Sequence, residues 1–207
     1  MNILHISGSP KGDRSDSQKL AARFLERYRK LHPDHMIRQV DVFDDRANPD
    51  FGAVHAFHKL APLFREPQTD EGRRAWVATD RLIEDFDRAD KILLSCPMWN
   101  YSVPWAMKRY LDHLMQPGRT FGFDPATRRH MGLLRDRPVQ FILTRSSTAS
   151  GDEQDFQLPY LLHVFGSMGV RDVRIVSAGA TTKPSTPARQ AYLESFSSQL
   201  ENAAAAF

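Results

Sequence analysis

The feature that most constrains the fold is a short apolar strand that runs into a loop of small hydroxyl residues and then into a helix. Residues 3–6 are apolar except for His5, as in a buried strand. The loop that follows, residues 7–17, offers backbone N–H groups and serine hydroxyls at the positive end of a helix dipole, and so predicts an anion site. A helix is expected after this loop, because apolar residues recur there at the spacing of one helix face: Leu20, Phe24, Tyr28 and Leu31.

The spacing of this loop limits the kind of anion. It matches neither G-x-x-x-x-G-K-[ST] nor G-x-G-x-x-G, the loops that cradle nucleotide phosphates and pyrophosphates. One compact phosphate therefore suits the loop better than a pyrophosphate. The alternative is that its serines and glycines only turn the chain and cap the helix.

Strand and helix patterns alternate along the rest of the chain. Four further apolar segments predict strands at residues 36–43, 90–96, 138–144 and 170–177, and the last predicted helix carries Tyr192, Phe196 and Leu200. Five strands separated by helices predict an α/β fold, a doubly wound five-stranded parallel sheet in the order 2-1-3-4-5 with helices on both faces. Two segments interrupt the alternation: an irregular stretch over 44–72, and an extended or hairpin excursion over 118–137 after the third helix.

Composition excludes several function classes. A chain of 207 residues suits one domain, which we expect over residues 1–207. No apolar run approaches the roughly 20 residues that cross a bilayer, and the start does not resemble a signal peptide, so we expect a cytoplasmic protein without a membrane partner. The net charge is +3, but Lys and Arg are dispersed among acids, which argues against nucleic-acid binding. The one cysteine, Cys96, excludes an internal disulfide.

The carboxyl end of the predicted third strand must supply the second half of any site that the first loop begins. The apolar and aromatic side chains there suit a flat heteroaromatic ring, and Asn100 and free backbone groups suit its polar edge. The loop after the predicted fourth strand, residues 144–151, is again small and rich in donors. Three loops therefore predict one shared crevice. The residues that open the second loop are Pro97, Met98, Trp99, Asn100 and Tyr101, and those that open the third are Thr144, Arg145, Ser146 and Ser147.

Other reactive side chains have plain structural explanations. Cys96 has no paired base, so we interpret it as buried filling rather than a nucleophile, and His5 should pack with one ring nitrogen satisfied. His55 and His58 lack a third ligand, so we interpret them as surface or interface residues and predict no metal. No Ser-His-Asp or paired-carboxylate arrangement is evident. We therefore predict no catalytic side chain and expect the reactive group to be a cofactor.

Taken together, these motifs resemble the FMN-dependent NAD(P)H azoreductase and quinone reductase family of the flavodoxin-like superfamily, over nearly the full chain. The resemblance implies that the serines of the first loop hold the FMN phosphate, that residues 97–101 contact the isoalloxazine ring, and that residues 144–147 meet its edge. Ser146 and Ser147 stand where the family usually has glycines, which reshapes that contact. The features that carry the resemblance are Ser9, Ser15 and Ser17, the P-M-W-N motif at 97–100, Thr120 and Phe121, the run 159–161, and Gly169.

The resemblance also implies an activity, in which FMN passes hydride through its N5 atom from NADH or NADPH to quinones and azo compounds, by a ping-pong two-electron mechanism. Two alternatives stay open. One is a flavodoxin-like electron-transfer module without its own small-molecule turnover, although the surface facing its partners would normally be acidic and this chain is mildly basic. The other is a flavin-free α/β protein that binds a different phosphate compound.

The two interruptions of the alternation carry more apolar side chains than solvated loops should expose, so we expect a homodimer. In the resembling family the partner subunit supplies aromatic residues from the excursion. Phe121 and Phe123 are therefore expected to line the substrate space beside the other chain's FMN. The alternative is a hairpin folded over its own chain's site.

Overall fold

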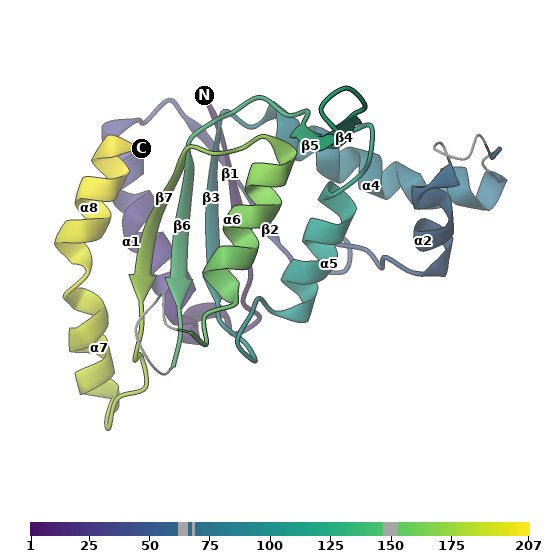
Figure 1. Ribbon diagram of the computed structural model, residues 1–207. Coiled ribbons are helices and arrows are strands. Elements are labelled where there is room, and N and C mark those ends of the chain that lie inside the picture. The colour runs from purple at the N-terminus through teal and green to yellow at the C-terminus, as the bar shows by residue number, and fades with distance from the viewer. Residues whose placement is uncertain (62–65, 68, 147–152) are drawn as a thin grey trace.

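Five short apolar segments form one parallel sheet in the computed structural model, which describes residues 1–61, 66–67, 69–146 and 153–207. The strands pair in the order β2-β1-β3-β6-β7 (Figure 1). Counted within this sheet alone the order is 2-1-3-4-5, so the predicted topology is confirmed. The strands are β1 (Asn2–Ser7), β2 (Met36–Asp41), β3 (Lys91–Pro97), β6 (Val139–Thr144) and β7 (Val173–Ala178).

Helices cover both faces of the sheet, because successive side chains of a strand point to opposite faces and both faces here are apolar. Ile3 of β1 packs in a layer with α1 (Asp16–Leu31) and α8 (Ser197–Ala206). The adjacent Leu4 packs in a second layer with α4 (Asp70–Arg88), α5 (Trp105–Leu114) and α6 (Gln157–Met168). Within the described ranges, no helix has both the length and the apolar character needed to cross a membrane.

Some elements differ from the sequence prediction. The stretch 44–72, predicted to be irregular, contains the helix α2 (Ala53–Lys59). The predicted last helix is two helices, α7 (Thr186–Glu194) and α8, because the hydroxyl of Ser195 donates to the Tyr192 carbonyl and that of Ser197 to the Glu194 carbonyl. β2 ends before residue 43 and β7 begins after residue 170. Leu31 is exposed.

Two histidines that we interpreted as surface or interface residues are buried within the chain. His55 donates from Nε2 to the Ala75 carbonyl at 3.2 Å, and the Nε2 atom of His58 lies 3.1 Å from the Thr69 hydroxyl. Both rings pack where α2 meets α4. Gly72 of α4 leaves space for the His58 ring, since a Cβ there would lie only 2.5 Å from it. The prediction was wrong because the sequence pattern did not reveal α2.

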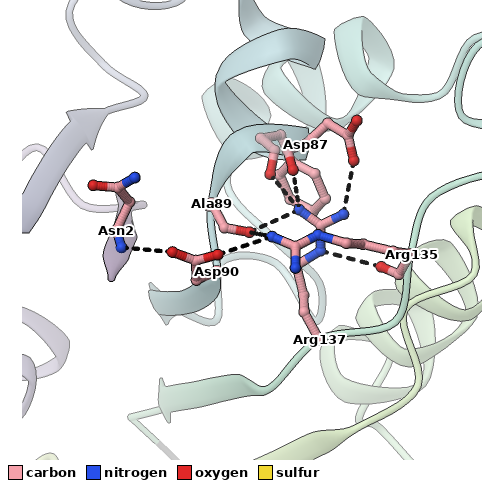
Figure 2. Close-up of polar contacts among 7 residues, drawn as sticks. Asn2, Asp87, Ala89, Asp90, Arg135 and Arg137 are labelled. Carbon is pink, nitrogen blue, oxygen red and sulfur yellow. Dashed lines mark hydrogen bonds and ion pairs between the residues drawn. The ribbon is translucent and has the colours of Figure 1, made fainter.

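The amino edge of the sheet is fixed by two arginines (Figure 2). Arg137 has a side chain only 1% exposed, and its Nη1 donates to the carbonyls of Phe86, Asp87 and Ala89, which are among the last of α4. Carbonyls at the end of a helix lack donors from a following turn, and the guanidinium supplies donors to them. The Phe86 carbonyl also accepts from the backbone N–H of Ala89 at 3.3 Å. Arg135 donates to Asp90, whose other oxygen accepts from the backbone N–H of Asn2. The end of α4, the start of β1 and the approach to β6 are thereby held together.

The excursion after α5 is a hairpin, as predicted, formed by β4 (Phe121–Asp124) and β5 (Arg129–Gly132). It lies at the amino edge of the sheet, at the top of Figure 1, whereas the arrowheads of β6 and β7 point to the bottom. The backbone N–H of Leu134, just after β5, donates to the Met168 carbonyl at the end of α6. The 12 residues of α6 span about 18 Å, so the hairpin is roughly that far from the carboxyl edge.

Replacing Gly132 by alanine should detach this hairpin from α6. A Cβ at Gly132 would lie 2.1 Å from the backbone nitrogen of Gly169, so backbone must move. Overpacking of this kind costs about 1–3 kcal/mol, and we expect Gly132→Ala to lower the free energy of unfolding, measured in urea, by at least that much. Gly122→Ala in the same hairpin is the control, because its Cβ would meet only side-chain atoms at 3.6 Å. Equal losses in the two variants would contradict this docking.

A buried histidine makes stability depend on pH. As predicted, His5 has one ring nitrogen satisfied, with Nε2 lying 2.9 Å from the Ser95 hydroxyl. Burial lowers the pKa of His5 from 6.5 to about 4. Between these values the unfolded chain binds a proton at His5 and the folded chain does not. The stability present above pH 6.5 is therefore lost as the pH falls toward 4.

His5→Gln should remove this pH dependence while keeping a hydrogen-bonding side chain beside Ser95. A shift of this size corresponds to roughly 3 kcal/mol, so the wild-type chain should lose about that much more stability than the variant as the pH is lowered through this window. Urea unfolding at a series of pH values measures both proteins. Parallel curves would show that folding does not lower the pKa of His5.

Candidate functional site

The carboxyl ends of β1, β3, β6 and β7 surround a cavity of about 610 Å3. Helices cover the faces of the sheet, so this edge is where loops can meet a ligand. The predicted convergence of three loops is observed, and the loop after β7 adds a fourth wall. The lining residues are Ser9, Lys11, Arg14, Ser15, Asp16, Pro97, Met98, Trp99, Asn100, Thr144, Arg145, Ser146, Thr181, Thr182, Lys183 and Arg189.

The first loop is held by a glutamine of α1. The side-chain amide of Gln18 donates to the Ser7 hydroxyl and to the Ser9 carbonyl, each at 2.8 Å. Ser15 is the N-cap of α1 and accepts from the backbone N–H of Gln18. Ser15 also lines the cavity, so the residue that caps α1 belongs to the site as well.

Ser17 occupies a different position from the other two predicted serines. It is fully buried and does not line the cavity, whereas Ser9 and Ser15 do. Its hydroxyl lies 3.1 Å from that of Ser15. The Ser17 hydroxyl therefore contacts a residue of the cavity lining without belonging to the lining itself.

The second loop is a tight turn at the end of β3. The backbone groups of Trp99 and Ser102 hydrogen-bond to each other in both directions, which leaves Asn100 and Tyr101 as the two turn residues. Both have left-handed backbone angles, with φ of 46° and 70°. The turn presents residues 97–100 to the cavity. Tyr101 lies outside the lining, with 57% of its surface exposed.

The third wall depends on a buried ion pair. Arg145, at the end of β6, lines the cavity and pairs with Asp155, and both side chains are only 3% exposed. Asp155 also accepts from the backbone N–H groups of Gln157 and Leu158 at 3.0 Å, so it caps the start of α6. Thr144 and Ser146 line the cavity on either side of Arg145. Ser147 lies outside the described residues.

The sequence analysis did not predict that the loop after β7 lines the cavity, and it named few of the charged lining residues. Thr181, Thr182 and Lys183 follow β7 and line the cavity; the backbone N–H of Thr181 donates to the Arg145 carbonyl at 3.0 Å. The predicted topology could have indicated this wall, because a fifth parallel strand must end at the same edge of the sheet as the others, and its following loop then lies beside theirs. The charged lining residues are Lys11, Arg14, Asp16, Arg145, Lys183 and Arg189, five cations and one acid, a balance that favours an anionic ligand.

Several other predicted groups lie away from the cavity. Phe121 and Phe123 belong to the hairpin at the opposite edge of the sheet. Cys96 is buried as predicted, and burial raises the pKa of its thiol, which disfavours the reactive thiolate. In the part of the chain that the structure describes, no three His, Cys, Asp or Glu side chains gather where a metal ion could bind.

Comparison with known proteins agrees with this architecture. The sequence model of a family described as flavodoxin-like fold matches residues 1–200. An FMN-dependent NADH:quinone oxidoreductase of Nitratidesulfovibrio vulgaris is 35% identical over 178 residues, 84% of each chain. The FMN-dependent NADH:quinone oxidoreductase 2 of Pseudomonas syringae pv. tomato is 37% identical over 186 residues, 87% of each chain. A solved azoreductase of Bacillus anthracis matches with a TM-score of 0.87 over 100% of both chains at 20% identity, which supports the fold alone.

Proposed function

This chain belongs to the family described as flavodoxin-like fold, and from that membership we propose that it is an FMN-dependent oxidoreductase that reduces quinones and azo compounds with NADH. One observation carries the proposal. A single cavity joins an anion-binding serine loop to a loop that presents apolar and aromatic side chains. FMN has these two parts, a phosphate and a flat heteroaromatic ring.

The residues at the phosphate end fit FMN. The cavity volume of about 610 Å3 lies within the usual range for cofactor sites. Ser9 and Ser15 supply hydroxyl donors, Lys11 and Arg14 supply positive charge, and α1 begins beside them. We expect Ser9 and Ser15 to bind the phosphate directly, and Ser17 to orient the Ser15 hydroxyl.

The residues at the ring end fit as well. Met98 and Trp99 offer apolar and planar contact, and the Trp99 ring is supported by Phe43 at 5.7 Å between ring centres. Asn100 stands exposed at the turn, where its amide can meet the polar edge of the ring. Thr144, Arg145 and Ser146 follow the neighbouring strand β6 and supply further polar groups to the lining. Ser146 carries a Cβ atom at a position where the resembling family usually has glycine. Contact of Ser147 with the ring stays a prediction.

When bound, FMN supplies two-electron hydride chemistry at its N5 atom, between NADH and a quinone or azo group. The chain's own task is to bind, orient and exclude water. The buried Arg145–Asp155 pair fixes the wall after β6, and the hydrogen-bonded turn at 99–102 fixes the neighbouring wall after β3. We propose a ping-pong order because the nicotinamide and the acceptor would each stack on the exposed face of the flavin ring, and so would use the same space in turn.

Titration of the full chain with FMN should saturate at about one FMN per chain, and the loaded protein should oxidise NADH when a quinone is present. Absorbance measures both the FMN bound per chain and the rate of NADH oxidation. Ser15→Asp is the informative variant, since aspartate also serves as an N-cap but places a negative charge in the anion loop. We expect FMN affinity to fall about a hundredfold or more while the melting temperature is retained.

The alternatives predict different outcomes. Failure to bind FMN would favour a flavin-free protein. If the protein binds FMN but does not oxidise NADH when a quinone is present, an electron-transfer module would be favoured. Parallel double-reciprocal plots at several quinone concentrations would support the ping-pong order, and intersecting plots would contradict it. Replacement of NADH by NADPH in the same assay tests the choice of donor.

We also propose a homodimer with shared sites. Phe123 is 54% exposed on the hairpin, and Phe57, Leu60 and Met131 are exposed on or beside α2 and the hairpin. The hairpin docks at the amino edge, about the length of α6 away from the cavity, so it does not cover its own chain's site. In a two-fold dimer, Phe123 with Phe121 beside it can approach the cavity of the partner subunit instead.

Two mixed dimers should distinguish sharing from closure within one chain. In the first, Ser15→Asp and Phe123→Ala lie in one chain and the other chain is wild type. In the second, the two substitutions lie in opposite chains. If Phe123 covers the partner's site, turnover per bound FMN should fall in the first dimer and stay normal in the second. The reverse pattern, or a monomer by light scattering that still reduces quinone, would contradict the shared site.

A further inference from the structure

The anion site contains a buried acid. Asp16 is the first residue of α1, its side chain is 5% exposed, and it lines the cavity beside Ser15. One oxygen, Oδ1, has no hydrogen-bond partner among the described residues. A carboxylate in this position competes with a phosphate for the positive end of the helix, and it repels the phosphate.

An arginine from a distant part of the chain compensates this charge. Arg189 of α7 donates from Nε at 3.0 Å and from Nη2 at 2.6 Å to Oδ2 of Asp16, across 173 residues of sequence. Its side chain is 43% exposed and lines the same cavity. Within the described part of the chain, Arg189 is the cation that pairs with Asp16, whereas Arg14 lines the cavity without touching it.

We infer that Arg189 is a positioning residue for the cofactor, which makes the loop at 9–17 able to accept a phosphate by neutralising Asp16. This inference rests on the proposed function. The arginine acts on the ligand through the charge of Asp16, so its effect depends on both the phosphate and the carboxylate being present. Helix α7 thereby contributes to a site whose serines come from the first loop.

A purely structural role is the competing explanation, since the same ion pair also ties α7 to α1. The two roles differ in which ligand they affect. Loss of a tether should weaken every flavin equally, whereas loss of charge compensation should weaken only a flavin that carries phosphate. Riboflavin, which is FMN without the phosphate, is therefore the matched probe.

The test compares the full-length wild-type chain with Arg189→Gln, Asp16→Asn and the double variant, each titrated with FMN and with riboflavin. Arg189→Gln should weaken FMN binding about 10- to 100-fold and change riboflavin binding less than about twofold. Asp16→Asn should bind FMN at least as tightly as wild type. The double variant should regain most of the affinity that Arg189→Gln loses, because no uncompensated carboxylate remains.

Arg14→Gln is the control, because it removes the same charge from the same cavity without touching Asp16. Its effect on FMN binding should be unchanged when Asp16→Asn is added. Unchanged FMN affinity in Arg189→Gln, equal losses for FMN and riboflavin, or a double variant as weak as Arg189→Gln would overturn the inference alone. Absence of FMN binding by the wild-type chain would overturn the proposed function and the inference with it.

Discussion

The structure depends on the burial of both faces of a parallel sheet. Each crossover from one strand to the next must pass over a face, and here the crossovers are helices that pack on it. Only the two edges at the strand ends remain open. At the amino edge, Arg135 and Arg137 satisfy the end of α4 and hold the loop before β6. The carboxyl edge is left to loops with space between them, which is the physical reason that the cavity lies there.

Much of this arrangement could be predicted because it follows from local patterns and general rules of topology. Apolar runs marked all five strands, right-handed crossovers fixed their order, and the shared direction of the strands brought residues 9, 98 and 144 together. α2 was missed because seven residues show too little periodicity, and the burial of His55 and His58 was missed with it. The contact between Asp16 and Arg189 could not be predicted, since nothing near either residue specifies a partner so far along the chain.

The serine loop shows a second limit of sequence reasoning. Capping a helix and binding an anion require the same residue types at the same place, because both use the unpaired N–H groups of the first turn. Ser15 caps α1 and also lines the cavity, while Ser17 is buried and lies beside it. No spacing rule separates these roles, and the distinction becomes visible only when the hydroxyls are placed relative to the cavity.

The turn at residues 99–102 has a strained backbone, which lowers local stability, and it also forms part of the cavity lining. Asn100 and Tyr101 hold left-handed backbone angles that cost free energy for residues with a Cβ, above all for the aromatic one. Glycine at position 101 would relieve this strain, although it would also free the unfolded backbone. The strained backbone keeps Asn100 in the lining of the cavity. Selection for thermal resistance alone would therefore tend to relax this turn, and its persistence would indicate that the protein is maintained for what it binds.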